Sequence, residues 1–276
     1  MIDLNVEIGG TTGKPDVVLL HGLGATHFSW HKTLEILKPN FKTYAFDLWG
    51  FGESWPVPKN HNPTLREHAE AVISYMTAIP HISKNIAGKG NSEIILIGHS
   101  MGGGICIQIL DILNSMGASS KLTAKKVALI APAARPASFE FNPKSIFNEG
   151  LAANDSVAMA KKLLEKIYVS KVPEIEKYAK KYAINFTFER FLFMGAQALQ
   201  LSNAASYASK YQHYKTEAKL IWGIDDPILN INEHGRALAK EWPTASITEI
   251  KNCGHAPHEE YPKIVNKIIE TFLKKQ

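Results

Sequence analysis

The chain has 276 residues, of which 45% are hydrophobic, and a formal net charge of +5 at pH 7. This length and composition suit one large globular domain, with or without an insertion. No run approaches the roughly 18 apolar residues of a membrane span, and MIDLNVEIGG at the start lacks the pattern of a secretion signal, so we expect a cytoplasmic protein. Nearly all of the positive excess lies within residues 140–215, without a recognition helix or RNA signature, so nucleic-acid binding is not expected.

Short apolar runs alternate with longer helical patterns through the first half of the chain. The predicted strands are Val17–Leu20, Thr43–Phe46, Ile94–Ile97 and Val127–Ile130, and the predicted helices are Phe28–Leu37, Leu65–Ile79 and Gly102–Leu113. This βα rhythm predicts an α/β fold, with a mostly parallel twisted sheet and helices on both faces. The chain before the first of these strands has room for about one strand, at Ile2–Ile8, so the antiparallel start of the sheet should be short.

The rhythm stops after Pro132 and resumes with strands at Lys219–Trp222 and Ile247–Ile250 and a closing helix at Ile264–Leu273. The intervening chain shows only helical spacing. We therefore expect a core domain formed by residues 1–135 and 215–276, with residues 136–214 inserted as helices over one end of the sheet.

The two cysteines, Cys106 and Cys253, lie far apart in different predicted elements. This pattern indicates neither a disulfide framework nor a metal site, and we expect two free thiols. No motif for a cofactor or metal is present.

The segment GHSMGG, residues 98–103, joins a predicted strand to a predicted helix. Its glycines leave room for a sharp turn that would present Ser100 at the helix N-terminus, where free N–H groups favour developing negative charge. The same serine could simply cap the helix, and the isolated motif does not decide between the two interpretations.

A serine nucleophile needs a general base and an acid that orients the base. Asp225 and Asp226 follow the strand Lys219–Trp222, and His255 follows the last strand. Functional groups collect beyond the carboxyl ends of parallel strands, so these side chains should meet near Ser100. The order Ser, Asp, His is the one expected of an α/β-hydrolase.

The chain resembles the α/β-hydrolase superfamily through its lid-bearing serine hydrolases. The matching segments, in the expected order, are residues 21–24 (HGLG), 47–54 (DLWGFGES), 98–103 (GHSMGG), 223–227 (GIDDP) and 254–255 (GH). The resemblance implies that Ser100 is the nucleophile, His255 the base and Asp226 the acid, with the adjacent Asp225 as the alternative acid. It also implies an oxyanion hole formed by the backbone N–H groups of Leu23 and Met101.

Other residues near these motifs have supporting interpretations. We expect His21 and His99 to orient the backbone of the oxyanion loop and elbow, and Asp47 and Gly52 to fix a strand-end turn. We expect His258 and Glu259 to be solvated, and Cys106 to lie in the core. Five residues are candidates for the substrate pocket: Trp30, Trp49, Phe188, Phe191 and Met194.

A serine at residue 100 argues against the related haloalkane dehalogenases and epoxide hydrolases, which place an aspartate there. The related carbon–carbon hydrolases typically have Asn before the nucleophile and Trp after the catalytic histidine, where this chain has His99 and Ala256. Proline iminopeptidases typically show a GGSWG elbow. A carboxylic ester hydrolase is the leading interpretation, and a carbon–carbon hydrolase or a non-catalytic small-molecule receptor on the same fold remains open. Nothing specific favours a lyase or a cofactor-free oxidoreductase.

Residues 161–181 of the expected lid hold seven lysines against three glutamates. Such a segment is ordinarily a solvated helical face. It could also dock an acidic partner through Lys161, Lys162 and Lys166. Family members that cleave the methyl ester of pimeloyl-carrier protein combine this fold with a basic lid. The substrate is therefore expected to be either a small ester or an ester linked to an acyl carrier, while the oligomeric state is not indicated.

Overall fold

The computed structural model describes residues 2–11, 15–88, 90–136, 155–202 and 211–274. The strands are β1 (Val6–Gly9), β2 (Asp16–Leu20), β3 (Thr43–Phe46), β4 (Ser92–His99), β5 (Leu122–Ile130), β6 (Glu217–Gly223) and β7 (Ala245–Ile250). The helices are α1 (His31–Leu37), α2 (Leu65–Ala78), α3 (Pro80–Ala87), α4 (Met101–Met116), α6 (Ser156–Ile167), α7 (Ile175–Tyr182), α8 (Phe188–Ser202), α10 (Ala237–Glu241), α11 (Pro257–Glu260) and α12 (Pro262–Lys274).

In the described residues these strands form one seven-stranded sheet in the order β1-β3-β2-β4-β5-β6-β7. All neighbouring pairs are parallel except β1 with β3. The α/β fold with a mostly parallel sheet and a short antiparallel start is thereby confirmed. Every strand predicted from the apolar runs is present.

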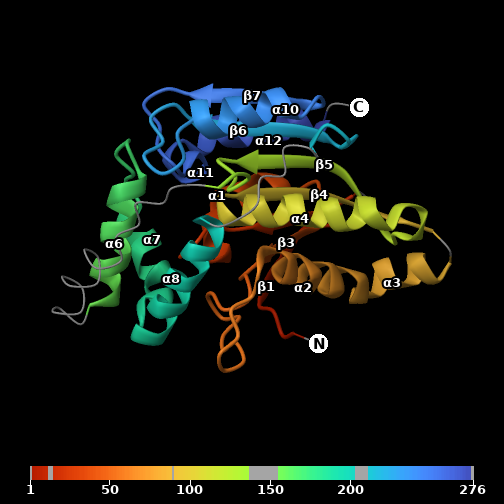
Figure 1. The fold of residues 1–276 in the computed structure, drawn as a ribbon, viewed down its shortest axis with the longest axis horizontal. Helices are drawn as coiled ribbons and strands as arrows, with labels where there is room; N and C mark the ends of the chain where they lie inside the picture. Colours follow the sequence, from red (N-terminus) through yellow and green to blue (C-terminus); the bar gives the residue numbers. More distant parts are fainter. Residues whose placement is uncertain (1, 12–14, 89, 137–154, 203–210, 275–276) are drawn as a thin grey trace.

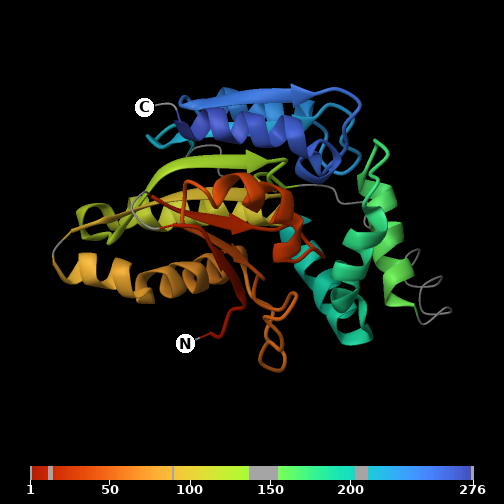
Figure 2. The same cartoon turned by 180° about the vertical axis from the view of Figure 1, so that it is seen from behind.

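The two faces of the sheet bury alternate residues of each strand. Val18 and Leu20 of β2 belong to the apolar cluster that includes α2 and α4, whereas Val17 and Leu19 belong to the cluster that includes α1 and α12. Successive strand residues point to opposite faces, so a strand covered on both sides reads as a continuous apolar run. Figure 1 shows α4 in front of the sheet, and Figure 2 shows α1 and α12 on the opposite face.

The helices α6, α7 and α8 lie at the end of the sheet towards which the parallel strands point (Figures 1 and 2). They belong to the segment between β5 and β6, which we call the insertion and define as residues 136–214. Two stretches of this segment near its predicted boundaries, residues 137–154 and 203–210, lie outside the described residues. In the part of the chain that the structure describes, no helix combines the length and apolarity needed to cross a membrane.

Candidate active site

Ser100 lies at the sharp turn between β4 and α4. Its backbone has φ of 49° and ψ of −116°, and its side chain makes no capping hydrogen bond to the helix. Positive φ is unfavourable for a residue with a β-carbon and persists only where the surroundings enforce it. Hydrogen bonds from Ser100 N to Ile130 O and from Ala133 N to Ser100 O hold this conformation. The structure therefore contradicts the interpretation of Ser100 as an ordinary helix cap.

Two glycines give the turn its room. A β-carbon on Gly102 would lie 2.2 Å from the carbonyl oxygen of Leu20, and one on Gly98 would lie 2.5 Å from the carbonyl oxygen of Gly102. Neither distance is compatible with a side chain, because both contacts are to backbone. The glycines of GHSMGG thus allow α4 to begin directly against β2.

The side chains of Ser100, His255 and Asp226 form a continuous hydrogen-bonded chain. Nε2 of His255 lies 2.9 Å from Oγ of Ser100, and Nδ1 of His255 lies 2.8 Å from Oδ2 of Asp226. All three residues are buried. With Nδ1–H donating to the carboxylate, Nε2 is left to accept the serine proton, which is the tautomer that a general base requires.

In the loop after β6, Asp226 pairs with His255 and the adjacent Asp225 does not. Oδ1 of Asp226 accepts hydrogen bonds from the N–H groups of Ile228 and Leu229, at 2.8 and 2.9 Å. These two bonds fix the orientation of the carboxylate, whose Oδ2 faces His255. Asp225 is exposed to solvent. The predicted pairing of Asp226, and not Asp225, with His255 agrees with this geometry.

The loop after β2 runs directly past the serine. A β-carbon on Gly22 would lie 3.2 Å from the β-carbon of Ser100, which places the backbone next to Leu23 beside the elbow. His21 fixes this loop because its Nδ1–H donates to Gly22 O at 2.7 Å and its Nε2 accepts from Leu48 N at 3.0 Å. Burial lowers the pKa of His21 to about 4, so the ring stays neutral in these roles.

A row of buried rings packs behind His255. Nε2 of His99 donates to the carbonyl oxygen of His255 at 2.9 Å, and the His258 ring packs between those of His99 and Trp30. Burial, reinforced by the nearby His255, lowers the pKa of His258 to about 3. The expectation that His258 and Glu259 are solvated was wrong, because helix α11 is covered and both side chains are buried.

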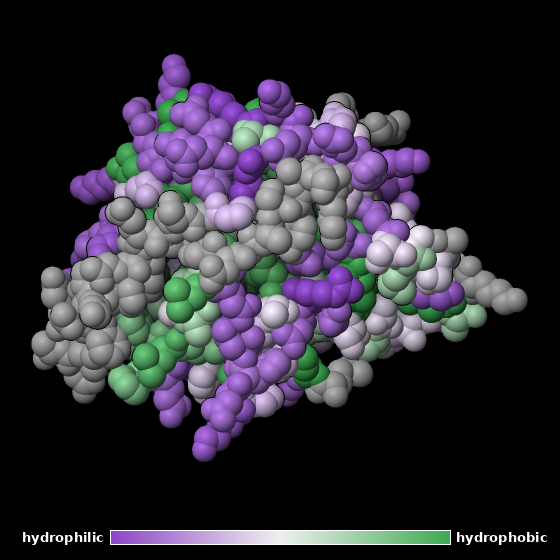
Figure 3. Space-filling view, viewed as in Figure 1, coloured by the Kyte–Doolittle hydropathy of each residue, from purple (hydrophilic) through white to green (hydrophobic). Residues whose placement is uncertain are grey.

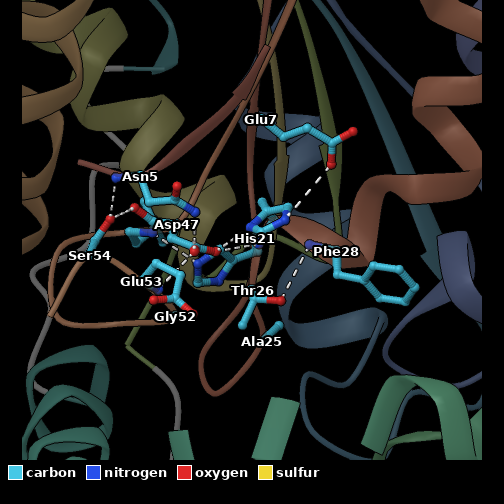
Figure 4. A network of polar contacts seen from close by, with 12 residues as sticks. Asn5, Glu7, His21, Ala25, Thr26, Phe28, Asp47, Gly52, Glu53 and Ser54 are labelled. Carbon is cyan, nitrogen blue, oxygen red and sulfur yellow. Dashed lines mark hydrogen bonds and ion pairs between the residues drawn. The ribbon is translucent and has the colours of Figure 1, made fainter. Parts of the chain in front are cut away.

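Asp47 is the centre of a polar network beside the loop that follows β2 (Figure 4). Its carboxylate accepts from His27 N at 2.7 Å, from Asn5 Nδ2 at 2.8 Å and from Glu53 N at 2.9 Å. Burial opposes its ionisation, but the hydrogen bond from the His27 side chain, the electrostatic influence of His21 and His27 and the bond from Glu53 N together outweigh burial and hold the pKa of Asp47 well below its usual range. Asp47 thus joins the residue just before β1, the loop after β2 and the turn at Gly52, as predicted for a residue that fixes a strand end.

Comparison with known proteins places this site in a family. The sequence profile described as "Alpha/beta hydrolase family" matches residues 17–268. The chain belongs to the alpha/beta hydrolase family. The match includes every motif that contributes to the hydrogen-bonded chain around Ser100.

Individual relatives of this alpha/beta hydrolase carry different names. "Epoxide hydrolase 4" of Homo sapiens is 24% identical, with 97% of this chain and 74% of the relative covered. A Mycoplasma genitalium protein with an esterase/lipase name is 25% identical, with 93% and 88% covered. The solved structure of a thermophilic esterase from Thermogutta terrifontis superposes with a TM-score of 0.75 at 23% identity, covering 98% of this chain and 93% of that one. At this identity the structural likeness concerns the fold.

One residue of the insertion contacts the loop after β2, and no sequence pattern singled it out. Asn185 is buried, and its Nδ2 donates to the carbonyl oxygens of Gly24 and Ala25 at 3.1 and 2.8 Å. Its Oδ1 accepts from Gly52 N at 2.8 Å. Asn185 therefore ties the insertion of this hydrolase to both loops that Asp47 organises.

The predicted pocket residues have different surroundings. Trp30 has no exposed surface and packs in the core, so the prediction that it lines a pocket was wrong. Phe188 is 58% exposed, and its place in a substrate pocket stays a prediction. Phe191 and Met194 are buried, and the sulfur of Met194 would lie 2.9 Å from a β-carbon on Gly24 in the loop after β2. Trp49 is half-buried, with its ring 5.0 Å from that of His61.

The predicted docking lysines all lie on α6. Lys161 is paired with Glu176 of α7, so part of the positive charge is used within the insertion. Lys166 is exposed in the last turn of α6. Figure 3 shows hydrophilic side chains over much of one face and hydrophobic ones gathered at the lower left, the side on which α8 lies in Figure 1.

Among the described residues there is no group of three or more His, Cys, Asp or Glu side chains arranged to hold a metal ion. Both cysteines are free and buried, and burial raises the pKa of each thiol above its ordinary value. The placement of Cys106 in the core agrees with the prediction.

Proposed function

We propose that this chain is a carboxylic ester hydrolase that works through an acyl-enzyme on Ser100. The observation that carries the proposal is the hydrogen-bonded chain from Oγ of Ser100 through His255 to Asp226, with donor–acceptor distances of 2.9 and 2.8 Å. The esterase name of one relative supports the same reaction class. A serine hydroxyl at the elbow suits acyl transfer, whereas opening an epoxide through an alkyl ester needs a carboxylate there.

The proposed reaction has two halves. Nε2 of His255 takes the proton of Ser100 as Oγ attacks the ester carbonyl carbon, and the resulting oxyanion faces the N–H groups of Leu23 and Met101. The imidazolium, stabilised by Asp226, then gives its proton to the alcohol oxygen as the carbon–oxygen bond breaks. In the second half a water molecule, deprotonated by His255, attacks the acyl-enzyme, and the carboxylic acid leaves as Ser100 recovers its proton.

A fluorophosphonate reagent and p-nitrophenyl butyrate test this proposal together. We expect the reagent to modify Ser100 alone, and the ester to be turned over with a burst equal to the active-site concentration. Labelling without turnover would instead favour a small-molecule receptor that retains the site. Turnover that persists unchanged in Ser100→Ala would exclude the mechanism.

The carbon–carbon hydrolase alternative uses the same fold. It is less well supported because His99, which precedes the nucleophile, donates to the backbone of His255 and has a structural role of its own. Product analysis with a ring-cleavage dienoate and with an ester at equal concentration distinguishes the two reactions. Faster cleavage of the dienoate would overturn the ester assignment.

The ester could be small, or it could be presented by an acidic acyl carrier docked on α6. The excess of lysines over glutamates in residues 161–181 supports docking, while the pairing of Lys161 with Glu176 supports an ordinary surface. Reversing Lys161, Lys162 and Lys166 to Glu decides the matter. If α6 docks the carrier, the variant should have a lower kcat/KM for the carrier-linked ester only. Salt screens charges beyond about 8 Å at 0.15 M, so the wild-type kcat/KM for this ester should fall as salt is added, and the variant, which lacks the three lysines, should depend less on salt. Equal effects on carrier-linked and small esters would exclude docking.

A further inference from the structure

Two adjacent carboxylates follow the catalytic histidine and take no part in the hydrogen-bonded chain with Ser100. Glu259 and Glu260 end helix α11, and their exposed fractions are only 5% and 8%. Buried carboxylates are costly unless their oxygens are hydrogen-bonded. The partners that satisfy these two show what the residues hold together.

Glu260 joins two backbone segments through one side chain. Its Oε1 accepts from Gly254 N at 2.8 Å, next to His255 in the chain. Its Oε2 accepts from Val169 N and Ser170 N, both at 2.9 Å, in the part of the insertion that follows α6. Both oxygens therefore face backbone N–H groups, which can only donate.

The two segments also touch directly. His255 N donates to the carbonyl oxygen of Ile167, the last residue of α6, at 2.8 Å. A β-carbon on Gly254 would lie 2.4 Å from that oxygen and 2.9 Å from Val169 N. The backbone that carries the catalytic histidine is thus in contact with the insertion itself.

Glu259 makes the second connection, through side chains. One of its oxygens accepts from the hydroxyl of Tyr182 at 2.5 Å, and the other accepts from the hydroxyl of Tyr168. Tyr168 follows α6 and Tyr182 ends α7, so one carboxyl group holds both helices. The ionisable groups that influence Glu259 or contact it are Tyr168, Tyr178, Tyr182, Glu260, His255 and His258.

We propose that Glu259 and Glu260 are positioning residues that anchor residues 167–182 to the His255 loop, and that His255 reaches Ser100 only while this segment is docked. The proposal rests on the proposed function, because it assigns these carboxylates a role in presenting the base. It makes the end of the insertion next to His255 a fixed wall of the active site, so any opening for substrate takes place elsewhere.

Isosteric amides test the two residues differently. In Glu260→Gln the amide NH₂ must face a backbone N–H, so at least one connection is lost. We expect kcat to fall by about 10- to 100-fold, comparable to the cost of a misplacement of roughly 1 Å, with a smaller change in KM. Glu259→Leu removes both acceptors of the tyrosine hydroxyls and should lower kcat as well, whereas Glu259→Gln should restore much of that loss, because a tyrosine hydroxyl can accept as well as donate. Glu70→Gln, on the exposed side of α2, is the matched control and should behave as wild type.

The kcat of each variant is calculated from the concentration of sites that react with fluorophosphonate, so that unfolded protein is not included in the enzyme concentration. Hydrogen–deuterium exchange is measured on peptides covering residues 167–182 and 252–258, which should lose protection together in Glu260→Gln. Wild-type kcat in Glu260→Gln, or loss of protection in one peptide only, would overturn the proposal. If the wild-type protein neither hydrolyses esters nor reacts at Ser100, the proposed function fails, while the exchange measurement still decides whether the carboxylates anchor the insertion.

Discussion

Ser100 and His255 are 155 residues apart in the chain, yet Oγ of one lies 2.9 Å from Nε2 of the other. This contact forms only when the elbow after β4 and the loop after β7 are both in place. We expect Ser100→Ala and His255→Ala each to lower kcat by about 10⁴-fold or more, with little further loss in the double variant, because such residues act as a unit. Circular dichroism and thermal melting provide the control for folding. Additive losses would show that the two side chains act separately.

The two neighbouring aspartates should differ sharply in their effects. Asp226→Asn keeps an oxygen for the N–H groups of Ile228 and Leu229 but removes the carboxylate that orients His255, so we expect kcat to fall by about 10⁴-fold. Asp225→Asn changes an exposed side chain and should leave kcat within about twofold. Ester hydrolysis by the two purified variants makes the comparison. The opposite ranking would reassign the acid.

Two helical glycines should respond in opposite directions to alanine. A β-carbon on Gly102 would meet backbone oxygen at 2.2 Å, so Gly102→Ala should lower the free energy of unfolding by about 3 kcal/mol or more. A β-carbon on Gly195 of α8 meets nothing within 4 Å, so Gly195→Ala should raise it by about 0.5–1 kcal/mol. Urea denaturation at constant pH measures both changes. A tolerated Gly102→Ala would contradict the close approach of α4 to β2.

Glu259 should make stability depend on pH in a definite direction. Burial raises the pKa of Glu259 from 4.5 to about 7, although hydrogen bonds from Tyr168 and Tyr182 oppose the shift. The folded state therefore holds the proton more tightly than the unfolded state, and this contribution is complete below about pH 4.5 and lost as the pH rises through about 7. The shift corresponds to about 3 kcal/mol.

The measurement is the difference in free energy of unfolding between wild type and Glu259→Gln from pH 4 to pH 8. The glutamine of the variant has no proton to lose, so the free energy of unfolding of the variant should rise relative to that of the wild type as the pH increases across this window. A difference that stays constant would show that folding leaves the pKa of Glu259 unshifted, and a change in the opposite sense would show that folding lowers this pKa.

The sheet was predictable because its strands are short apolar runs covered on both faces, and each run, such as residues 94–97, appears in the structure. Helix α3 was not predicted. Its first residue, Pro80, reads as a break after α2, although proline is well suited to the first turn of a helix. Local pattern alone does not distinguish a proline that ends one helix from a proline that begins the next.

The candidate site was predictable where a motif joins a strand end to a chemical group, as at Ser100 and His255. It was not predictable where burial comes from the insertion. His258 and Glu259 resemble the polar first turn of a surface helix. Glu259 is covered by tyrosines about 80 to 90 residues earlier in the chain, and His258 packs against the rings of Trp30 and His99. Asn185 carries no pattern either, because its three hydrogen-bond partners are backbone groups on separate loops.

The backbone of Ser100, at φ of 49° and ψ of −116°, has a consequence for directed evolution. These angles are the mirror image of an ordinary extended conformation, which glycine adopts without strain and a residue with a β-carbon does not. Glycine at residue 100 would relieve the strain and remove the nucleophile in one step. A library selected for thermal tolerance alone should therefore enrich glycine at this position, and only a simultaneous demand for turnover would retain the serine.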